Sequence, residues 1–380
     1  MHHDGLSYEE ILRYDRHLKL PEFGLQSQTK LKNSAVLVVG AGGLGIPVLQ
    51  YLTAAGIGKL GLVEHDTVAL SNLQRQVLYN TEEIGLRKAT LAHQKLSILN
   101  PHVTWQLYPC WLDPQNAYDI ITPYDIIIDC SDNFATRYLI NDVCVALDKT
   151  FVFGAIYKFE GQVAVFNGID ATTGDRTATY RCLFPEPPLP SEVPNCAEAG
   201  VLGVLPALIG SMQAAEAIKI LTGIGKPLYN QLWHIDLLTM QTYTLRIKRQ
   251  VAQPKHHKPD MSSPNTHHHY AKPVPVLSPQ ALAEKLAGND QLITLIDVRE
   301  PFEYEICHLP NSLLIPLHSL PNQVDTISTQ GEVVVYCHHG IRSMYAIQLL
   351  QQANPNIIYY NLEGGIDAWA ATVDPQMTRY

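Results

Sequence analysis

The chain has 380 residues, of which 46% are hydrophobic and 17% are charged; this composition indicates two or three globular domains and excludes a chain that is disordered throughout. Its 36 acidic and 27 basic residues give a net charge of −9, so the chain lacks the basic field expected of a nucleic-acid binder. The seven cysteines are odd in number and never spaced as Cys-x-x-Cys, which favours free thiols in a reducing compartment.

Membrane association is not expected from the apolar segments. The opening MHHDGLSYEE lacks the apolar core of a signal peptide. The longest weakly polar stretch, residues 199–212, is only about 14 residues long and contains Pro206, so it is expected to be too short and too broken to span a bilayer. We therefore expect a cytoplasmic protein without a membrane partner.

The first part of the chain alternates strand and helix patterns. A capping box of Ser7 and Glu10 predicts a first helix that runs through Arg13 and Arg16 and places both arginines on one face. The next expected strands are residues 35–39, 59–66, 125–130, 151–156 and 161–166, and the expected helices are residues 81–99 and 214–221. Continuous apolar strands between helices predict an α/β domain with a parallel sheet covered on both faces.

A second, smaller domain is expected after a linker. Residues 251–275 are rich in proline and histidine and show no apolar period, so they are interpreted as a solvated linker rather than a metal site. Strand patterns follow at residues 294–299, 332–337 and 356–360, and helix patterns at 281–287 and 345–352. The predicted organisation is one domain over residues 1–250, the linker, and another domain over residues 276–380.

A glycine-rich loop joins the first apolar strand to a helix. The glycines are Gly40, Gly42, Gly43 and Gly45, and their spacing lets backbone N–H groups approach phosphates at a helix N-terminus. Glu64 and Asp66 come about 20 residues later, where a carboxylate would accept from ribose hydroxyls. These features alone fit an NAD-dependent dehydrogenase equally well.

The following segments favour a nucleoside triphosphate over a dinucleotide. Asn72, Arg75 and Gln76 follow the ribose acid, and Lys88 opens the next helical pattern. A pyrophosphate leaving group requires fixed cations of this kind. Asp132 ends an apolar strand, where a carboxylate can hold Mg²⁺.

Together these motifs resemble the ubiquitin-activating superfamily, in particular the molybdopterin-synthase and thiamin sulfur-carrier adenylyltransferases. The resemblance covers roughly residues 5–250 and rests on RYDRHL (13–18), GAGGLG (40–45), DTVALSNLQRQ (66–76), GLRK (85–88), DCSDN (129–133) and NCAEAGVLG (195–203). It implies a Rossmann-like adenylation domain that uses Mg-ATP to adenylate the C-terminal Gly-Gly carboxylate of a ubiquitin-like sulfur-carrier protein.

The same resemblance implies roles for individual residues. Asp66 would bind ribose, Arg75 and Lys88 the phosphates, and Asp132 magnesium. Arg16 would reach the phosphates in a partner subunit, which implies a homodimer.

A candidate thiol nucleophile, Cys337, lies in YCHHGIRS between a strand and a helix. Four residues separate it from Arg342, the second candidate catalytic residue of this segment. A loop of this length wraps its N–H groups around a single sulfur rather than a phosphate. Residues 276–380 resemble a rhodanese domain, which includes LIDVREPFEYEICHLP (295–310) and LEGGIDAWA (362–370). Asp297, Arg299 and Glu303 are interpreted as loop-bracing ion pairs rather than catalysts.

Two further cysteines distinguish the chain within this resemblance. Cys196 lies in a loop with five prolines between residues 185 and 194; the matching cysteine of related fused enzymes takes part in sulfur transfer, and the residues alone indicate only a loop thiol. Many relatives hold a structural zinc with two Cys-x-x-Cys pairs, of which only Cys182 is present here. One thiolate cannot complete a tetrahedral site, so zinc is predicted absent, which leaves open what braces the hairpin expected after Trp233.

The sequence thus predicts an ATP-dependent adenylyltransferase that thiolates a sulfur carrier with a Cys337 persulfide, supplied by a donor such as a cysteine desulfurase. An NAD-dependent oxidoreductase with an appended redox-sensing domain is the alternative, and it leaves Arg75, Lys88 and Asp132 unexplained. A non-catalytic carrier scaffold is the third hypothesis. The carrier itself stays open between molybdopterin, thiamin, cysteine and tRNA thiolation pathways.

Overall fold

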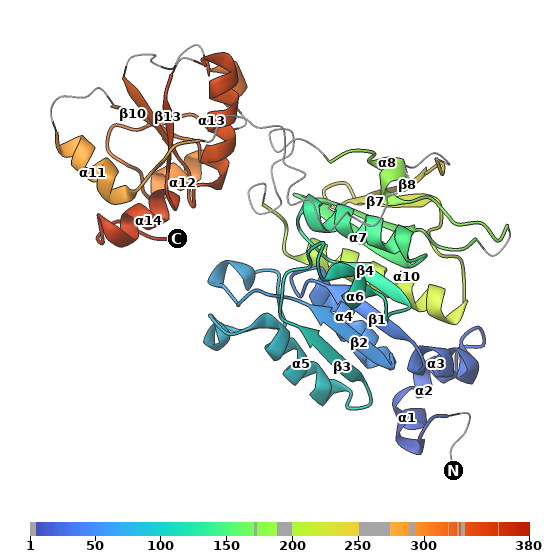
Figure 1. Cartoon of the computed structure of the whole chain (residues 1–380). Coiled ribbons are helices and arrows are strands. Elements are labelled where there is room, and N and C mark those ends of the chain that lie inside the picture. The colour runs from blue at the N-terminus through green and yellow to red at the C-terminus, as the bar shows by residue number, and fades with distance from the viewer. Residues whose placement is uncertain are drawn as a thin grey trace. The chain divides into compact units, whose positions relative to one another are not determined.

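The computed structural model describes residues 5–170, 173–187, 200–250, 274–288, 293–317, 319–324, 327, 331–355 and 357–380. These residues form two compact units, the first containing the described residues up to 250 and the second those from 274 onward (Figure 1). Most of the predicted linker, residues 251–273, lies outside the described residues.

The first unit is built on one eight-stranded sheet in the order β3-β2-β1-β4-β5-β6-β7-β8. The strands β1 to β5 pair in parallel, as predicted, and β6 to β8 add an antiparallel meander at one edge. Their bounds are Ala35–Val39 for β1, Lys59–Val63 for β2, Thr104–Tyr108 for β3, Ile126–Asp129 for β4, Thr150–Tyr157 for β5, Glu160–Phe166 for β6, Gln231–Asp236 for β7 and Gln241–Arg246 for β8.

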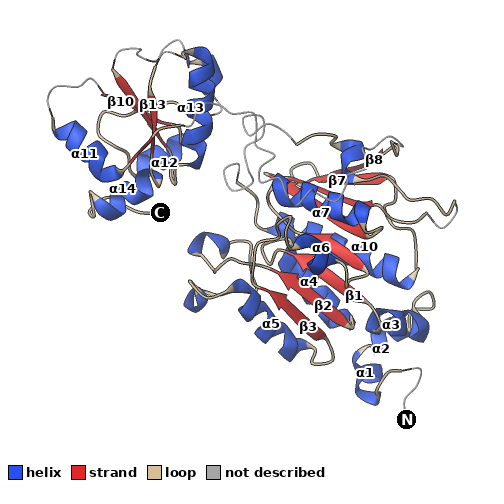
Figure 2. Ribbon diagram, in the orientation of Figure 1, coloured by secondary structure: helices blue, strands red, loops and turns tan. Residues whose placement is uncertain are grey.

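Helices cover both faces of this sheet (Figure 2). Alternate residues of β1 separate the two cores, because Val36 and Val38 pack on one face while Leu37 and Val39 pack on the other. The first core is covered by α3 (Gly24–Lys32), α4 (Gly45–Ala55), α5 (Lys88–Leu99) and α10 (Val204–Thr222), and the second by α6 (Ala117–Ile121), α7 (Phe134–Ala146) and α8 (Tyr180–Leu183).

Several predicted helices have different bounds, including the one expected over residues 214–221, which is only the second half of α10. The capping box of Ser7 and Glu10 is present, but the single first helix is wrong: α1 (Tyr8–Arg13) and α2 (Asp15–Leu18) are separated at Tyr14. The Tyr14 ring is 3% exposed and its hydroxyl accepts from Asn100 at 2.9 Å, so a buried contact interrupts the helix. The helix expected from residue 81 begins only with α5, because residues 81–83 form a separate turn, η2 (Thr81–Glu83).

The expectation that no segment near Pro206 is long enough to cross a bilayer is also wrong. The helix α10 has 19 residues and a mean hydropathy of 1.4 over its most apolar window, enough by length and composition alone. Pro206 lies in its first turn, where the N–H it lacks would have no helical partner. Its packing is that of a core helix, however, since it contacts α4, β5 and β6 and buries Gln213 and Glu216.

The second unit is a parallel sheet in the order β11-β10-β12-β13-β9. Its strands are β9 (Val276–Leu277), β10 (Ile293–Asp297), β11 (Leu313–Leu314), β12 (Glu332–Tyr336) and β13 (Tyr359–Leu362), and its helices are α11 (Pro279–Ala287), α12 (Pro301–Ile306), α13 (Ile341–Ala353) and α14 (Gly365–Thr372). Ala346, Ile347 and Leu350 of α13 pack on one face, whereas Leu282 of α11 and Trp369 of α14 pack on the other. This unit is therefore a small α/β domain, as predicted.

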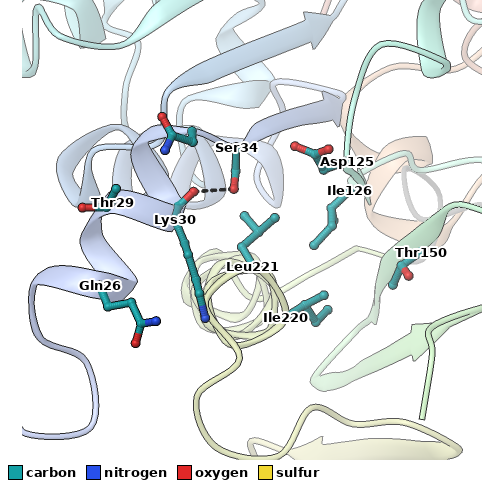
Figure 3. A pocket seen from close by; sticks show the side chains of 10 residues that line it. Gln26, Thr29, Lys30, Ser34, Asp125, Ile126, Thr150, Ile220 and Leu221 are labelled. Carbon is teal, nitrogen blue, oxygen red and sulfur yellow. Dashed lines mark hydrogen bonds between the residues drawn. The ribbon is translucent and has the colours of Figure 1, made fainter. Parts of the chain in front are cut away.

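A wide groove of about 810 Å³ lies at the amino ends of β1, β4 and β5 (Figure 3). Its polar groups already serve the fold. Lys30 Nζ donates to the Thr222 carbonyl at 2.8 Å, Ser34 Oγ donates to the Lys30 carbonyl at 2.7 Å, and Asp125 accepts from the Ala35 N–H at 2.8 Å. The chemistry-bearing residues lie instead at the opposite, carboxyl ends of the strands.

Candidate active sites

A cavity of about 230 Å³ lies at the carboxyl ends of β1, β2 and β4. It brings together most of the residues singled out by the sequence, namely Gly40, Gly42, Gly43, Asp66, Arg75, Gln76, Lys88 and Asp132. Gly45 and Asn72 do not line the cavity, but they hold the loops that form its wall. Open α/β sheets bind ligands at this edge.

The glycine loop passes too close to neighbouring backbone for any side chain. Gly40 has φ of +102°, and a Cβ there would lie 2.8 Å from the carbonyl oxygen of Cys130. A Cβ on Gly45 would collide with the carbonyl oxygen of Gly40. The loop therefore presents bare N–H groups at the N-terminus of α4, where an anion is stabilised.

The structure separates the roles of the two acidic residues after β2. Glu64 is 7% exposed and accepts from two backbone N–H groups, those of Ala41 at 2.7 Å and Asp66 at 2.8 Å. Tyr79 Oη donates to the Ala41 carbonyl at 3.0 Å, so both polar groups of Ala41 are held. Glu64 thus braces the glycine loop, while the Asp66 side chain, 51% exposed, faces the cavity.

Lys88 is a buried cation in the cavity wall. The residue is only 4% exposed, and Nζ lies 3.1 Å from Oδ2 of Asp66. The other oxygen of Asp66 lies 2.8 Å from Nε2 of His65. The buried ammonium of Lys88 is only partly neutralised by the half-exposed Asp66 carboxylate, so it can also attract an anion that enters the cavity.

Asn72 shapes the turn that carries Arg75 and Gln76 into the cavity. Its Oδ1 accepts from the Ala69 N–H at 3.1 Å, and its carbonyl accepts from the N–H groups of Arg75 at 3.1 Å and Gln76 at 2.9 Å. Arg75 Nη1 donates to the Ser71 carbonyl at 2.9 Å. Gln76 is 3% exposed, and its Oε1 has no hydrogen-bond partner among the described residues. A buried acceptor without a donor fits a ligand that brings one.

At the end of β4 the structure distinguishes a structural aspartate from an available one. Asp129 is fully buried, accepts from Ser131 Oγ at 2.6 Å, and pairs with Arg137 Nε at 3.1 Å. Burial disfavours the charged guanidinium, but Asp129 and Tyr180 together outweigh burial and raise the pKa of Arg137. Asp132 is exposed, lines the cavity and has no partner among the described residues, so its carboxylate is free to hold a cation.

Sequence reasoning missed three cavity residues. Arg137 was signalled only by its place on the helix that follows the buried Asp129. Trp111 stacks on His65 with ring centroids 3.3 Å apart and an interplanar angle of 27°, and it is 60% exposed, which gives the cavity an aromatic wall. An exposed tryptophan in the irregular segment after β3 was the available signal.

The second site surrounds Cys337, directly after β12. The thiol is 2% exposed, the Gly340 N–H donates to Sγ at 3.1 Å, and Ser343 Oγ lies 3.5 Å from Sγ. Gly340 has φ of +90° and caps α13, so the helix N-terminus lies behind the sulfur. This is the arrangement that stabilises a thiolate or a persulfide anion.

The loop carbonyls are turned away from the sulfur. They accept hydrogen bonds from outside the loop: Cys337 O from Ile366 N at 2.9 Å, His338 O from Asp367 N at 3.1 Å, and Gly340 O from Asn361 Nδ2 at 2.9 Å. Gly365 has φ of +62°, and a Cβ there would collide with the carbonyl oxygens of Cys337 and His338. These carbonyls are thus fixed away from the sulfur, and the Gly340 N–H points toward it.

The ion pairs predicted to brace this loop are confirmed. Arg299 is fully buried, and its Nη2 lies 2.5 Å from Oδ2 of Asp297. Arg342 forms a two-fold pair with Glu303, at 2.6 and 2.7 Å. Burial alone would raise the pKa of Glu303, but hydrogen bonds from Arg342, the Glu300 N–H and Tyr380 lower it to about 2.

The remaining predicted residues are not gathered at either site. Cys196 lies outside the described residues. Arg16 is exposed on α2, does not line the cavity, and has no hydrogen bond or ion pair within the part of the chain that the structure describes. Cys182 accepts from the N–H groups of Thr179 and Gln250, both at 3.4 Å, and so links α8 to the chain that follows the β7–β8 hairpin.

Comparison with known proteins identifies the larger unit. The sequence profile of the ThiF family matches residues 14–257. The chain belongs to the ThiF family. A second profile, that of the rhodanese-like domain, matches residues 278–372, so this ThiF-family chain also carries a rhodanese domain.

Two curated relatives align with this ThiF-family chain over nearly its whole length, and a third aligns with part of it. The probable adenylyltransferase/sulfurtransferase MoeZ of Mycobacterium tuberculosis is 41% identical over 99% of the chain and 97% of its own length. The adenylyltransferase and sulfurtransferase MOCS3 of Drosophila grimshawi is 39% identical over 100% of the chain and 88% of its own length. The sulfur carrier protein adenylyltransferase of Thermus thermophilus is 55% identical over 63% of the chain and 89% of its own length. The chain is accordingly an adenylyltransferase and a sulfurtransferase, and ATP supplies the adenylyl group.

Solved structures agree on the fold of the ThiF domain. A crystal structure of Escherichia coli MccB aligns with a TM-score of 0.57 at 20% identity and covers 70% of this chain and 77% of that one. The structure of PaaA aligns with a TM-score of 0.55 at 21% identity, and the alignment covers 65% of this chain and 76% of the PaaA chain. Both confirm the Rossmann-like α/β fold predicted from the sequence.

Proposed function

We propose that the chain adenylates the C-terminal carboxylate of a ubiquitin-like sulfur carrier that ends in Gly-Gly, and then converts it to a thiocarboxylate with sulfur carried on Cys337. The observation that carries this proposal is the single cavity in which the glycine loop, Asp66, Arg75, Lys88 and Asp132 meet. The carrier is inferred from the Thermus relative, which is named a sulfur carrier protein adenylyltransferase.

In the first step a carboxylate oxygen of the carrier attacks the α-phosphorus of ATP. The bond from that phosphorus to the bridging oxygen of the β-phosphate breaks, and pyrophosphate leaves with its electron pair. We assign Lys88 and Arg75 to the developing charge on the phosphates and Asp66 to the ribose hydroxyls, because fixed charges stabilise such a transition state without reorganising. Asp132 would hold Mg²⁺, which would neutralise phosphate charge.

The buried amide of Gln76 supports a bound nucleotide. Its unpartnered Oε1 needs a donor, and a nucleotide supplies hydroxyl and amino donors that a bare phosphate lacks. Its Nε2 would lie 3.5 Å from a Cβ on Gly42, so the amide lies directly against the glycine loop. Trp111 offers the base an exposed ring face.

In the second step the terminal sulfur of a Cys337 persulfide attacks the acyl carbon and AMP leaves, which gives an acyl disulfide. A second thiol then attacks the Cys337 sulfur, releases the thiocarboxylate and forms a disulfide with Cys337 that an external thiol reduces. We assign this second thiol to Cys196. The persulfide is supplied by a sulfur donor such as a cysteine desulfurase.

The proposal includes a metal-free brace where many relatives hold zinc. Cys182 already accepts two backbone N–H groups, and the hairpin turn is closed by Asp236, which accepts from Leu238 N and Thr239 Oγ1, both at 2.8 Å. We therefore propose that zinc is not required. We also propose a cytoplasmic location, with no nucleic-acid or membrane partner.

The proposed function is tested by ATP–pyrophosphate exchange with a purified carrier that ends in Gly-Gly. We expect exchange that requires both the carrier and Mg²⁺, followed, once a persulfide donor is added, by a carrier mass that reports one oxygen replaced by sulfur. A carrier truncated by its two glycines is the matched control and should support neither reaction. Exchange that ignores the carrier, or tight NAD binding in its place, would overturn the proposal.

The proposed homodimer makes a separate prediction about Arg16. If Arg16 acts in the partner's site, mixing Arg16→Ala with Asp132→Ala subunits should create some sites with both residues intact, so exchange should recover to a fraction of wild type although each variant alone is inactive. Subunit exchange is verified by mixing tagged and untagged chains. Recovery that fails in a verified mixture would place Arg16 within its own chain's site or outside the reaction.

A further inference from the structure

Tyr380 links three residues around the Cys337 loop. Its hydroxyl accepts from Arg299 Nη1 at 2.7 Å and donates to Glu303 Oε1 at 3.0 Å. Its ring stacks on His338, the residue after Cys337, with centroids 4.3 Å apart and an interplanar angle of 7°. One side chain therefore contacts the end of β10, the helix α12 and the active-site loop.

The segment that carries Tyr380 is tied down along its length. After α14 the Met377 N–H donates to the Asp374 carbonyl at 3.0 Å, and Met377 packs against the core of this unit. Arg379 forms two hydrogen bonds to Asp367, at 2.8 and 3.0 Å. The N–H of Asp367 is also the group that fixes the His338 carbonyl. His338 is thus held at its ring by Tyr380 and at its carbonyl by Asp367.

The surroundings of His338 keep its imidazole uncharged near neutral pH. Burial and the neighbouring His339 lower the pKa of His338, as Arg299 also does, and the opposing charges of Asp367 and Glu303 do not offset them. The Nε2 atom is buried without a hydrogen-bond partner among the described residues. Tyr380 covers the His338 ring. The positive charge near the Cys337 sulfur therefore comes from backbone N–H dipoles rather than from a protonated His338.

We propose that Tyr380 is a positioning residue for sulfur transfer, which holds the His338 ring and the Glu303–Arg342 pair in place and thereby keeps the loop amides aimed at Cys337. Tyr380 does not touch the sulfur, and it acts through His338 and Glu303. The inference depends on the sulfurtransferase activity of the rhodanese domain and does not depend on which carrier is thiolated.

The test compares Tyr380→Ala and Tyr380→Phe in the full chain, by thiosulfate-to-cyanide transfer across about pH 5.5 to 8.5. Tyr380→Ala should lower kcat/KM by about 10- to 100-fold, since misplaced catalytic groups cost that much. It should also add a titration on the acid side of neutral pH, because losing the covering ring lessens the burial that lowers the pKa of His338. Tyr380→Phe keeps the stacked ring, so it should lose part of the rate without the new titration.

Alkylation of Cys337 by iodoacetamide, followed by peptide mass spectrometry, gives a second readout that needs no sulfur donor. Tyr380→Ala should show extra reactivity on the acid side of neutral pH, where a charged His338 favours the thiolate, and the added His338→Asn substitution should remove it. Phe302→Ala is the matched control, because Phe302 is a 62% exposed ring on α12 outside this network. Wild-type rate and pH profile in Tyr380→Ala, or extra reactivity that persists without His338, would overturn the proposal.

Discussion

Cys337→Ala should abolish sulfur transfer from thiosulfate to cyanide and thiocarboxylate formation on the carrier, while ATP–pyrophosphate exchange continues at the wild-type rate. The reason is the proposed role of this thiol as the nucleophile, whose sulfur accepts from the Gly340 N–H. The proposed adenylation site is a cavity whose described lining belongs to the first unit.

The matched control for this change is Cys307→Ala. Cys307 is a half-buried thiol of the same unit that packs with the core formed by Leu309 and Trp369, so its loss tests for a general effect of removing a sulfur. It should transfer sulfur at close to the wild-type rate. If sulfur transfer survived in Cys337→Ala and disappeared in Cys307→Ala, the assignment of the persulfide to Cys337 would be wrong.

Lys88→Ala should slow ATP–pyrophosphate exchange by about 10²- to 10³-fold, the usual cost of removing one preorganised donor from a charged transition state. The substitution also leaves Asp66 without its cation in the cavity, which further disfavours the incoming phosphates. Sulfur transfer from thiosulfate to cyanide should be unchanged, because Cys337 belongs to the second unit. A thermal unfolding curve of the variant tests whether the first unit is folded.

Lys95→Ala is the control for the loss of charge on α5. Lys95 lies on the same helix but pairs with Glu83 at 2.7 Å, and it is not part of the cavity lining. Its exchange rate should stay within a few-fold of wild type. Equal losses in the two variants would mean that the net charge of the helix matters and that Lys88 has no specific place on the phosphates.

Local patterns predicted β1, β2, β4, β5 and β6 but missed β3. They also predicted the edge of the sheet at which the site lies, since the glycine loop, Asp66 and Asp132 each follow a strand. They did not separate Glu64 from Asp66, because the difference is a contact between Glu64 and the N–H of Ala41, which belongs to another segment. Arg137 was missed for the same reason, as its role depends on burial beside Asp129. Tyr14, which breaks the first helix, is fixed by Asn100.

At the antiparallel edge strands and around Cys337, local sequence patterns again predicted some features, while others depend on residues far apart in the chain. Apolar runs predicted β5 and β6, but strand direction depends on connections that local patterns do not encode. The loop around Cys337 could be read from its length and glycine, whereas the stack of Tyr380 on His338 joins residues far apart in the chain. Sequence reasoning therefore found the groups that do chemistry and missed those that hold them.

The outward-facing carbonyls of the Cys337 loop also constrain the order in which a growing chain becomes reactive. The groups that hold these carbonyls, Asn361, Ile366 and Asp367, are synthesised after the nucleophile itself. Until they emerge from the ribosome, the carbonyls around the thiol lack these hydrogen-bond donors. We expect the thiolate of Cys337 then to be no more stable than that of an ordinary cysteine. We therefore expect vectorial synthesis to delay persulfide chemistry until α14 has docked.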